Sequence, residues 1–162
     1  MRLLCSAFCA TAVTLGLAAP ASAVPDGPLR PYLAHLEPLA FTWPADGTVT
    51  DGFGLRWGRP HLGVDIGILR SEDVRAAAAG TVSATGYLEG YEGYGNVVMV
   101  DVGDGYETLY AHLASAAVQV GDWVDRDAPL GIAGCTGSCT GTHLHFELRR
   151  DGVAVDPAPF FP

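Results

Sequence analysis

Residues 96–113 of the chain read NVVMVDVGDGYETLYAHL. Two runs rich in Val, Thr and Tyr, residues 96–101 and 106–113, lie on either side of Gly103-Asp104-Gly105. Short runs of β-branched and aromatic residues favour strands, and Asp-Gly between two such runs favours a tight hairpin. The stretch therefore predicts two neighbouring antiparallel strands.

Sequence on either side of this hairpin has the same character. Further strand-like runs separated by glycine turns are residues 80–87, 121–124, 129–133 and 143–149. The best helical candidate, Val74 to Ala79, is too short and ends at Gly80. We therefore expect an all-β fold, a compact antiparallel β-sheet domain with little helix.

The first 40 residues differ from the rest. Met1 and Arg2, an apolar stretch over residues 3–19 and Ala21-Ser22-Ala23 are typical of a cleaved export signal, residues 1–23. Polar residues interrupt the apolar stretch, which favours cleavage over a stable membrane anchor and predicts a secreted or cell-wall-associated protein. Residues 24–40 carry four prolines and are expected to form an arm or linker. The remaining sequence, 41–162, is long enough for one domain, which we expect to be monomeric.

The charge balance excludes one class of partner. The chain has 18 acidic residues against nine Lys and Arg, a formal net charge of −9. Nonspecific nucleic-acid binding needs clustered cations that neutralise phosphates, so nucleic acid is not an expected partner.

Cys135 and Cys139 are the two cysteines that would remain after export, because Cys5 and Cys9 lie in the signal. Two cysteines in an exported chain most often pair, and a ring this small would add roughly 2 kcal/mol at most. The alternative is a pair of metal-binding thiolates, which a reducing compartment would favour.

Four of the five histidines lie in organised places. His61 and Asp65 form an HxxxD pattern, and His143 and His145 should point to the same side of a strand because alternate residues share a face. Catalytic zinc sites take three protein ligands, from imidazole nitrogen and carboxylate oxygen, and leave a fourth position to water. His61, Asp65 and one of the two strand histidines would supply that set.

Two histidines would then be free to move protons or hold a developing oxyanion: His112 and the remaining strand histidine. A lone HxxxD is mostly noise, and paired histidines on a strand also occur as ordinary hydrogen-bonding groups. Their combination is far more specific than either alone. His35 has no partner near it in the sequence and is expected to be exposed to solvent.

Three segments together resemble a known family: FGLRWGRPHLGVDIG, NVVMVDVGDGYETLYAHL and GIAGCTGSCTGTHLHFEL. They are similar to the lysostaphin-type (LytM-domain) zinc metallopeptidases, which cut peptide bridges in bacterial peptidoglycan. The resemblance spans about residues 41–157. It implies a duplicated-hybrid-motif type of antiparallel β domain with a narrow groove over the metal.

The resemblance also implies roles for five residues. His61, Asp65 and His145 match the family's Zn²⁺ ligands. His112 and His143 match the two non-ligand histidines, one a general base and both candidates for transition-state stabilisation. The loop before HLHFE departs from the usual pattern, because it has Cys135 and Cys139 where serines are common. A disulfide there would stiffen one wall of the groove.

These observations lead to three hypotheses. The first is a secreted zinc metalloendopeptidase that acts on peptidoglycan peptides. The second is a non-catalytic wall-binding or regulatory module of the same fold that activates another cell-wall hydrolase; such relatives are expected to lack some of the five site residues. The third, a structural zinc protein, is weaker, because structural sites close all four positions.

Overall fold

The computed structural model describes Leu39 and residues 41–162, apart from Trp57. The expected export signal, residues 1–23, lies outside the described residues. So do His35 and the rest of the proposed arm, residues 24–40, except Leu39.

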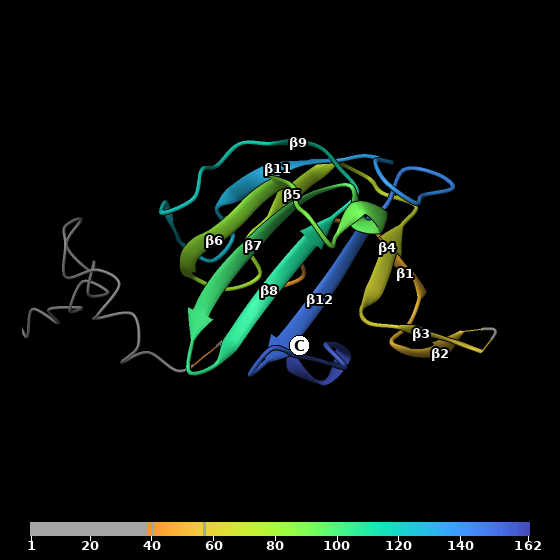
Figure 1. Cartoon of the computed structure of the whole chain (residues 1–162), viewed down its shortest axis with the longest axis horizontal. Coiled ribbons are helices and arrows are strands. Elements are labelled where there is room, and N and C mark those ends of the chain that lie inside the picture. Colours follow the sequence, from red (N-terminus) through yellow and green to blue (C-terminus); the bar gives the residue numbers. More distant parts are fainter. Residues whose placement is uncertain (1–38, 40, 57) are drawn as a thin grey trace, which may run out of the picture.

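The larger of the two main sheets has eight strands, and every pairing in it is antiparallel (Figure 1). In spatial order the strands are β1 (Thr48–Asp51), β4 (Val64–Gly67), β12 (Leu144–Arg150), β8 (Tyr106–Ala111), β7 (Asn96–Gly103), β6 (Gly80–Tyr87) and β10 (Trp123–Val124), with β13 (Val153–Val155) paired to β12. The three strands of the smaller sheet are β5 (Asp73–Arg75), β11 (Pro129–Ala133) and β9 (Leu113–Ala116). A separate hairpin joins β2 (Gly54–Arg56) to β3 (Arg59–His61).

The expected fold class, all-β and antiparallel, is confirmed. Within the described residues the helical elements are two 3₁₀ turns, η1 (Glu92–Tyr94) and η2 (Ala158–Phe160). The predicted hairpin is β7 and β8, in which Gly103 pairs with Tyr106 across Asp104 and Gly105. The run 106–113 differs from a single strand, because His112 has a φ of 62° and separates β8 from β9.

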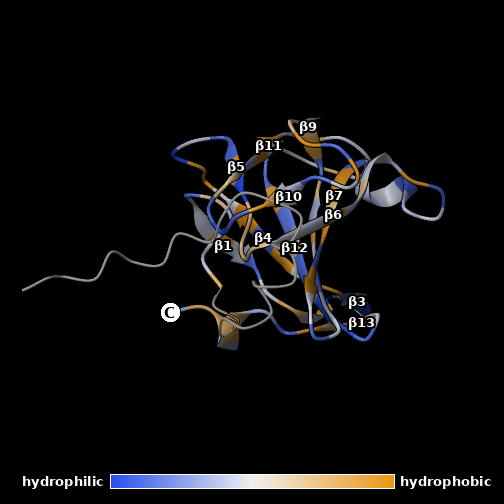
Figure 2. Ribbon diagram, turned by 90° about the vertical axis from the view of Figure 1, so that its left-hand side faces the viewer, coloured by the Kyte–Doolittle hydropathy of each residue, from blue (hydrophilic) through white to orange (hydrophobic). Residues whose placement is uncertain are grey.

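The main hydrophobic core includes side chains of both sheets. Hydrophobic residues lie on strands of both sheets in Figure 2. The large sheet contributes Tyr110 and Phe146, which are fully buried, and the small sheet contributes Leu113 and Leu130. Burial of this apolar surface is the main force that holds the two sheets together. A second cluster, Val97, Met99, Leu109 and Ala111, packs against side chains of the segment 88–94.

One glycine allows the close approach that positions the site. Gly63 lies between His61 and Asp65, and a Cβ atom at this position would stand 2.1 Å from the carbonyl oxygen of Phe146 in β12. Any side chain here would push β4 away from β12. Among the described residues, no helix has the length and apolar character needed to cross a membrane.

Candidate metal centre

Three side chains from three strands converge on one point. His61 ends β3, Asp65 lies in β4, and His145 lies in β12 directly opposite Asp65 in the strand pairing. Asp65 Oδ1 lies 3.1 Å from His61 Nε2 and 2.8 Å from His145 Nδ1, and the two ring nitrogens are 3.1 Å apart. These residues form a group that could hold a metal ion.

The outer nitrogens of both rings have acceptors that fix their protons. His61 Nδ1 donates to the carbonyl oxygen of Gly52 at 2.7 Å, and His145 Nε2 donates to Glu147 Oε1 at 3.1 Å. A neutral imidazole carries one ring proton, so the opposite nitrogen of each ring presents a lone pair. Both lone pairs face Asp65 Oδ1, which is also an acceptor.

Three such atoms this close to one another attract a cation, either a proton shared by Asp65 and His145 or a metal ion. The separations of 2.8 to 3.1 Å are only slightly shorter than the roughly 3.4 Å edge of a tetrahedron with zinc bonds near 2.1 Å. Two neutral imidazoles and one carboxylate are also a donor set that zinc accepts. The chemistry and spacing of the three side chains therefore fit a zinc ion.

The electrostatics of these side chains show the same attraction for positive charge. Burial acts to raise the pKa of Asp65, but its hydrogen bond to His145 and the nearby histidines lower that pKa to about 2. Burial acts to lower the pKa of His145, but the Asp65 and Glu147 carboxylates raise it above its usual value. Arg56 Nη1 donates to Asp65 Oδ2 at 3.1 Å, which orients Oδ1 toward the two rings.

A buried polar network supports His145 from behind. Glu147, fully buried, accepts from Tyr94 Oη at 2.6 Å and from Arg149 Nε at 2.8 Å. Burial acts to raise the pKa of Glu147, but the bonds from His145 and Tyr94 and the charge of Arg149 hold it below its usual value. Glu147 therefore stays ionised and keeps the Nε2 proton of His145 in place.

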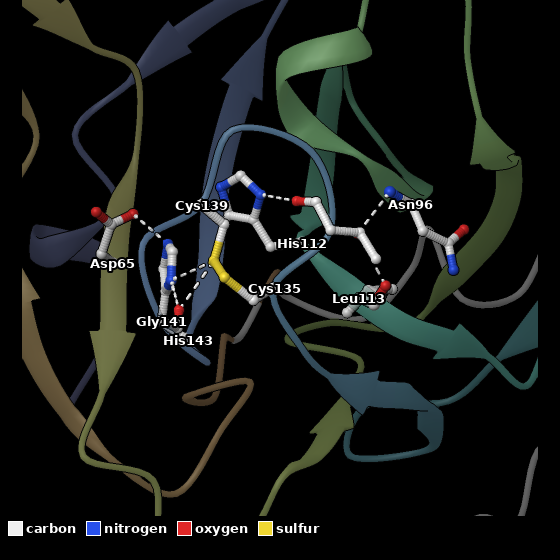
Figure 3. Close-up of a disulfide and its surroundings, with 9 residues drawn as sticks. Asp65, Asn96, His112, Leu113, Cys135, Cys139, Gly141 and His143 are labelled. Atoms are coloured by element: carbon white, nitrogen blue, oxygen red, sulfur yellow. Dashed lines mark hydrogen bonds and ion pairs between the residues drawn. A yellow bond between two sulfur atoms is a disulfide. The ribbon is translucent and has the colours of Figure 1, made fainter.

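The other two expected histidines lie beside this group. His112 Nδ1 donates to the carbonyl oxygen of Thr136 at 2.8 Å, and His143 Nδ1 donates to that of Gly141 at 2.8 Å (Figure 3). Their ring centroids are 4.7 Å apart, and His143 Nε2 lies 3.7 Å from Asp65 Oδ1. Burial lowers the pKa of His112, which favours the neutral ring. Each ring therefore has a lone pair on Nε2 that is available to accept a proton.

All five side chains border one cavity of about 590 Å³. The segment 138–142 and the end of the β2–β3 hairpin form parts of its lining. The predicted pairing of Cys135 with Cys139 is confirmed, since the two form a disulfide in the loop before β12. An open cavity gives a substrate access to the group.

The structure thus brings together all five residues expected from the sequence. It places His145, rather than His143, with His61 and Asp65, because His143 precedes β12 and pairs only with Gly134 in an isolated bridge. The sequence analysis did not single out Arg56, Tyr94 or Glu147. Glu147 had a detectable signal, since it is two residues after His145 and shares its strand face.

Comparison with known proteins agrees with this geometry. The family model described as "Peptidase family M23" matches residues 59–157, which include all five residues. The chain belongs to peptidase family M23.

Two curated relatives of this M23 chain differ in what their names say. It is 37% identical over 130 residues to the DD-carboxypeptidase/endopeptidase Mpg of Neisseria meningitidis, a match that covers 76% of this chain and 28% of the relative. It is 36% identical over 124 residues to the murein hydrolase activator EnvC of Escherichia coli, covering 73% of this chain and 28% of the relative. The chain thus spans less than a third of the length of these relatives.

Two solved structures share the fold of the M23 domain. A zinc-containing peptidase from Vibrio cholerae is 31% identical with a TM-score of 0.65, and the match covers 72% of this chain and 39% of that one. Lysostaphin from Staphylococcus simulans is 30% identical with a TM-score of 0.65, covering 75% of this chain and 52% of that one. The resemblance to lysostaphin-type peptidases is therefore confirmed.

Proposed function

We propose that the protein is a secreted zinc metalloendopeptidase that hydrolyses peptide bonds in the cross-bridges or stems of bacterial peptidoglycan. His61, Asp65 and His145 hold the Zn²⁺, and His112 and His143 are the catalytic residues. The observation that carries the proposal is the meeting of three possible ligand atoms at one point, beside the imidazoles of His112 and His143. The domain occupies residues 41–162, after an export signal, 1–23, and a linker, 24–40, and acts as a monomer.

When bound, zinc supplies Lewis acidity, which polarises the scissile carbonyl and acidifies the attacking water. Of the two free histidines, one accepts the water proton on Nε2 and later delivers it to the leaving amine. The other takes a proton from solvent on Nε2 before the reaction, hydrogen-bonds the developing oxyanion through it and keeps that proton throughout. His112 suits the base, because burial lowers its pKa and keeps the ring neutral. His143 suits the second role, because its Nε2 lies 3.7 Å from Asp65 Oδ1, next to the proposed ligand atoms.

The surroundings of the site support peptide hydrolysis. The cavity is open to solvent along the segment 138–142, so an extended peptide has room beside the histidines. Asp65 and His145 are each less than a tenth exposed, so water has little access to these two proposed ligands. The imidazoles of His112 and His143 border the cavity. The family model named for peptidases spans all five site residues, and relatives whose names include peptidase activities are 37% and 31% identical to this chain.

The second candidate is an activator of another cell-wall hydrolase. The relative EnvC, named as a murein hydrolase activator, favours it. An activator needs no metal and no free imidazoles, so nothing in that role would keep five polar side chains around one cavity. The complete site therefore supports the peptidase.

The test uses purified protein, freed of metal by chelator and then titrated with Zn²⁺. We expect one bound zinc, clearing of a peptidoglycan suspension only in the zinc-loaded protein, and new peptide ends in muropeptide fragments by mass spectrometry. A protein that binds the wall without zinc, releases no fragments and stimulates an added cell-wall hydrolase would contradict the peptidase and support the activator.

A further inference from the structure

The loop between β11 and β12, residues 134–143, includes His143, and its backbone holds both catalytic histidines. The carbonyl oxygen of Thr136 accepts the Nδ1 proton of His112, and that of Gly141 accepts the Nδ1 proton of His143 (Figure 3). These two carbonyls belong to one short loop, although the histidines come from different parts of the chain. The loop therefore decides which nitrogen of each ring carries the proton.

The position of that proton decides what each histidine can do. With hydrogen on Nδ1, the Nε2 lone pair of the ring can accept a proton from water. An imidazole released from such a bond changes to the form with hydrogen on Nε2, the tautomer that water favours. In that form the ring is a donor toward the cavity and cannot act as a base there.

Contacts with the segment 93–96 and with Leu113 hold the loop in place. Thr136 Oγ1 accepts from the amide of Asn96 at 2.9 Å and donates to the carbonyl oxygen of Leu113 at 3.0 Å. The amide of Ser138 donates to the carbonyl oxygen of Gly93 at 2.8 Å. Gly137 has a φ of 71°, and a Cβ atom there would stand 2.4 Å from the amide nitrogen of Gly95. The loop thus has a defined position, but that position depends on a few hydrogen bonds and on the close approach of small residues.

The disulfide joins the two ends of the docked segment, residues 136–138. Cys135 directly precedes Thr136, and Cys139 comes two residues before Gly141, so the bridge ties the two accepting carbonyls into one unit. Cys139 Sγ also lies 3.7 Å from His143 Nδ1, beside the same edge of the ring that Gly141 contacts. Without the bridge, a loop with glycine at 134, 137 and 141 would have many more conformations available.

We infer that the Cys135–Cys139 disulfide is a positioning element of the active site, which fixes the orientation and the tautomer of His112 and His143 through their Nδ1 hydrogen bonds to the loop carbonyls. This inference rests on the proposed function only for its effect on turnover. The tautomers of the two rings depend on the loop itself and can be measured without any substrate.

The first experiment compares the full chain with its Cys135→Ser/Cys139→Ser variant, both loaded with zinc. Serine keeps the size of the side chain and removes the bridge, and it avoids thiol reductants, which themselves bind zinc. We expect kcat to fall by about 10- to 100-fold with a small change in KM, because misplacement of a catalytic group affects the chemical step. Zinc content should be unchanged, since neither cysteine touches the metal group.

A second pair of variants tests the loop with the bridge intact. Thr136→Val removes the hydroxyl that anchors the loop and should lower kcat in the same way. Thr136→Ser keeps that hydroxyl and should rescue turnover. If all of these variants turn over at the wild-type rate well below their melting temperatures, the disulfide is only a stabilising crosslink and the inference is wrong.

The direct readout is ¹⁵N NMR of the histidine rings, which distinguishes a protonated nitrogen from one with a lone pair. In the wild type we expect hydrogen on Nδ1 of His112 and His143, and in both loop-weakening variants a shift of each toward Nε2. Unchanged tautomers would overturn the inference even if activity fell. Altered tautomers in a protein that never hydrolyses peptidoglycan would uphold the positioning role and reject the proposed function.

Discussion

Asp65 and His145 are paired residues on adjacent antiparallel strands, and their Oδ1 and Nδ1 atoms are 2.8 Å apart. They are 80 residues apart in sequence, so the register of β4 against β12 creates the pair. A slip of one residue would turn one of the two side chains to the opposite face of the sheet. The metal group is therefore as rigid as the sheet itself.

Asp65→Asn should weaken zinc binding by at least about 100-fold, more than loss of a supporting partner usually does. The substitution keeps the shape of the side chain and removes the only negative charge in the donor set. Competition with a chromophoric chelator measures the change. Asp46→Asn is the matched control, because Asp46 pairs with Arg70 away from the cavity. Equal zinc affinity in the two variants would rule out Asp65 as a ligand.

Glu147→Gln should lower zinc affinity by about 10- to 100-fold, the usual effect of losing a carboxylate that supports a ligating histidine. The amide can offer its NH₂ group to His145 and so favour the wrong tautomer. Glu107→Gln provides the control, since Glu107 contacts Arg149 but not His145. If both variants bind zinc as the wild type does, the tautomer of His145 does not depend on Glu147.

His143→Ala should reduce kcat by about 10²- to 10³-fold while one zinc stays bound. The ring lies 3.7 Å from Asp65 but outside the group of three ligand atoms. Metal analysis of the same preparation used for the activity assay checks both parts. Loss of zinc together with activity would show that His143 is a ligand, and full activity would remove it from the mechanism.

Tyr110→Phe should destabilise the domain by about 1–3 kcal/mol without altering zinc affinity, because it leaves a buried amide without an acceptor. The hydroxyl oxygen of Tyr110 accepts from the amide of Ala77 at 2.8 Å and is fully buried. Urea unfolding measures the free energy of unfolding. Tyr87→Phe makes the same chemical change at a side chain that is 67% exposed, and it should have little effect. Equal losses in the two variants would mean that the bond to Ala77 contributes nothing.

The fold class and the types of residue in the site could be predicted from local patterns in the sequence. Runs of β-branched and aromatic residues on either side of Asp104-Gly105 were enough to predict the hairpin of β7 and β8, because both signals are local. The break at His112 was not predictable in the same way. Here φ is positive, and the His112 amide donates a hydrogen bond to the carbonyl oxygen of Tyr94, which lies in another part of the chain. Strand ends depend on such long-range partners.

Which histidine joins the metal group, and where the ring protons lie, depends on the tertiary structure. His143 and His145 look alike in the sequence, and the pairing of β12 with β4 places His145 against Asp65 while His143 remains in the loop. The protons on the rings are likewise set by carbonyls and carboxylates brought together by folding, such as Thr136 O for His112. Local sequence patterns can identify possible donors and acceptors. A hydrogen bond forms only when the two atoms come within about 3 Å, and the packing of strands far apart in sequence sets that distance.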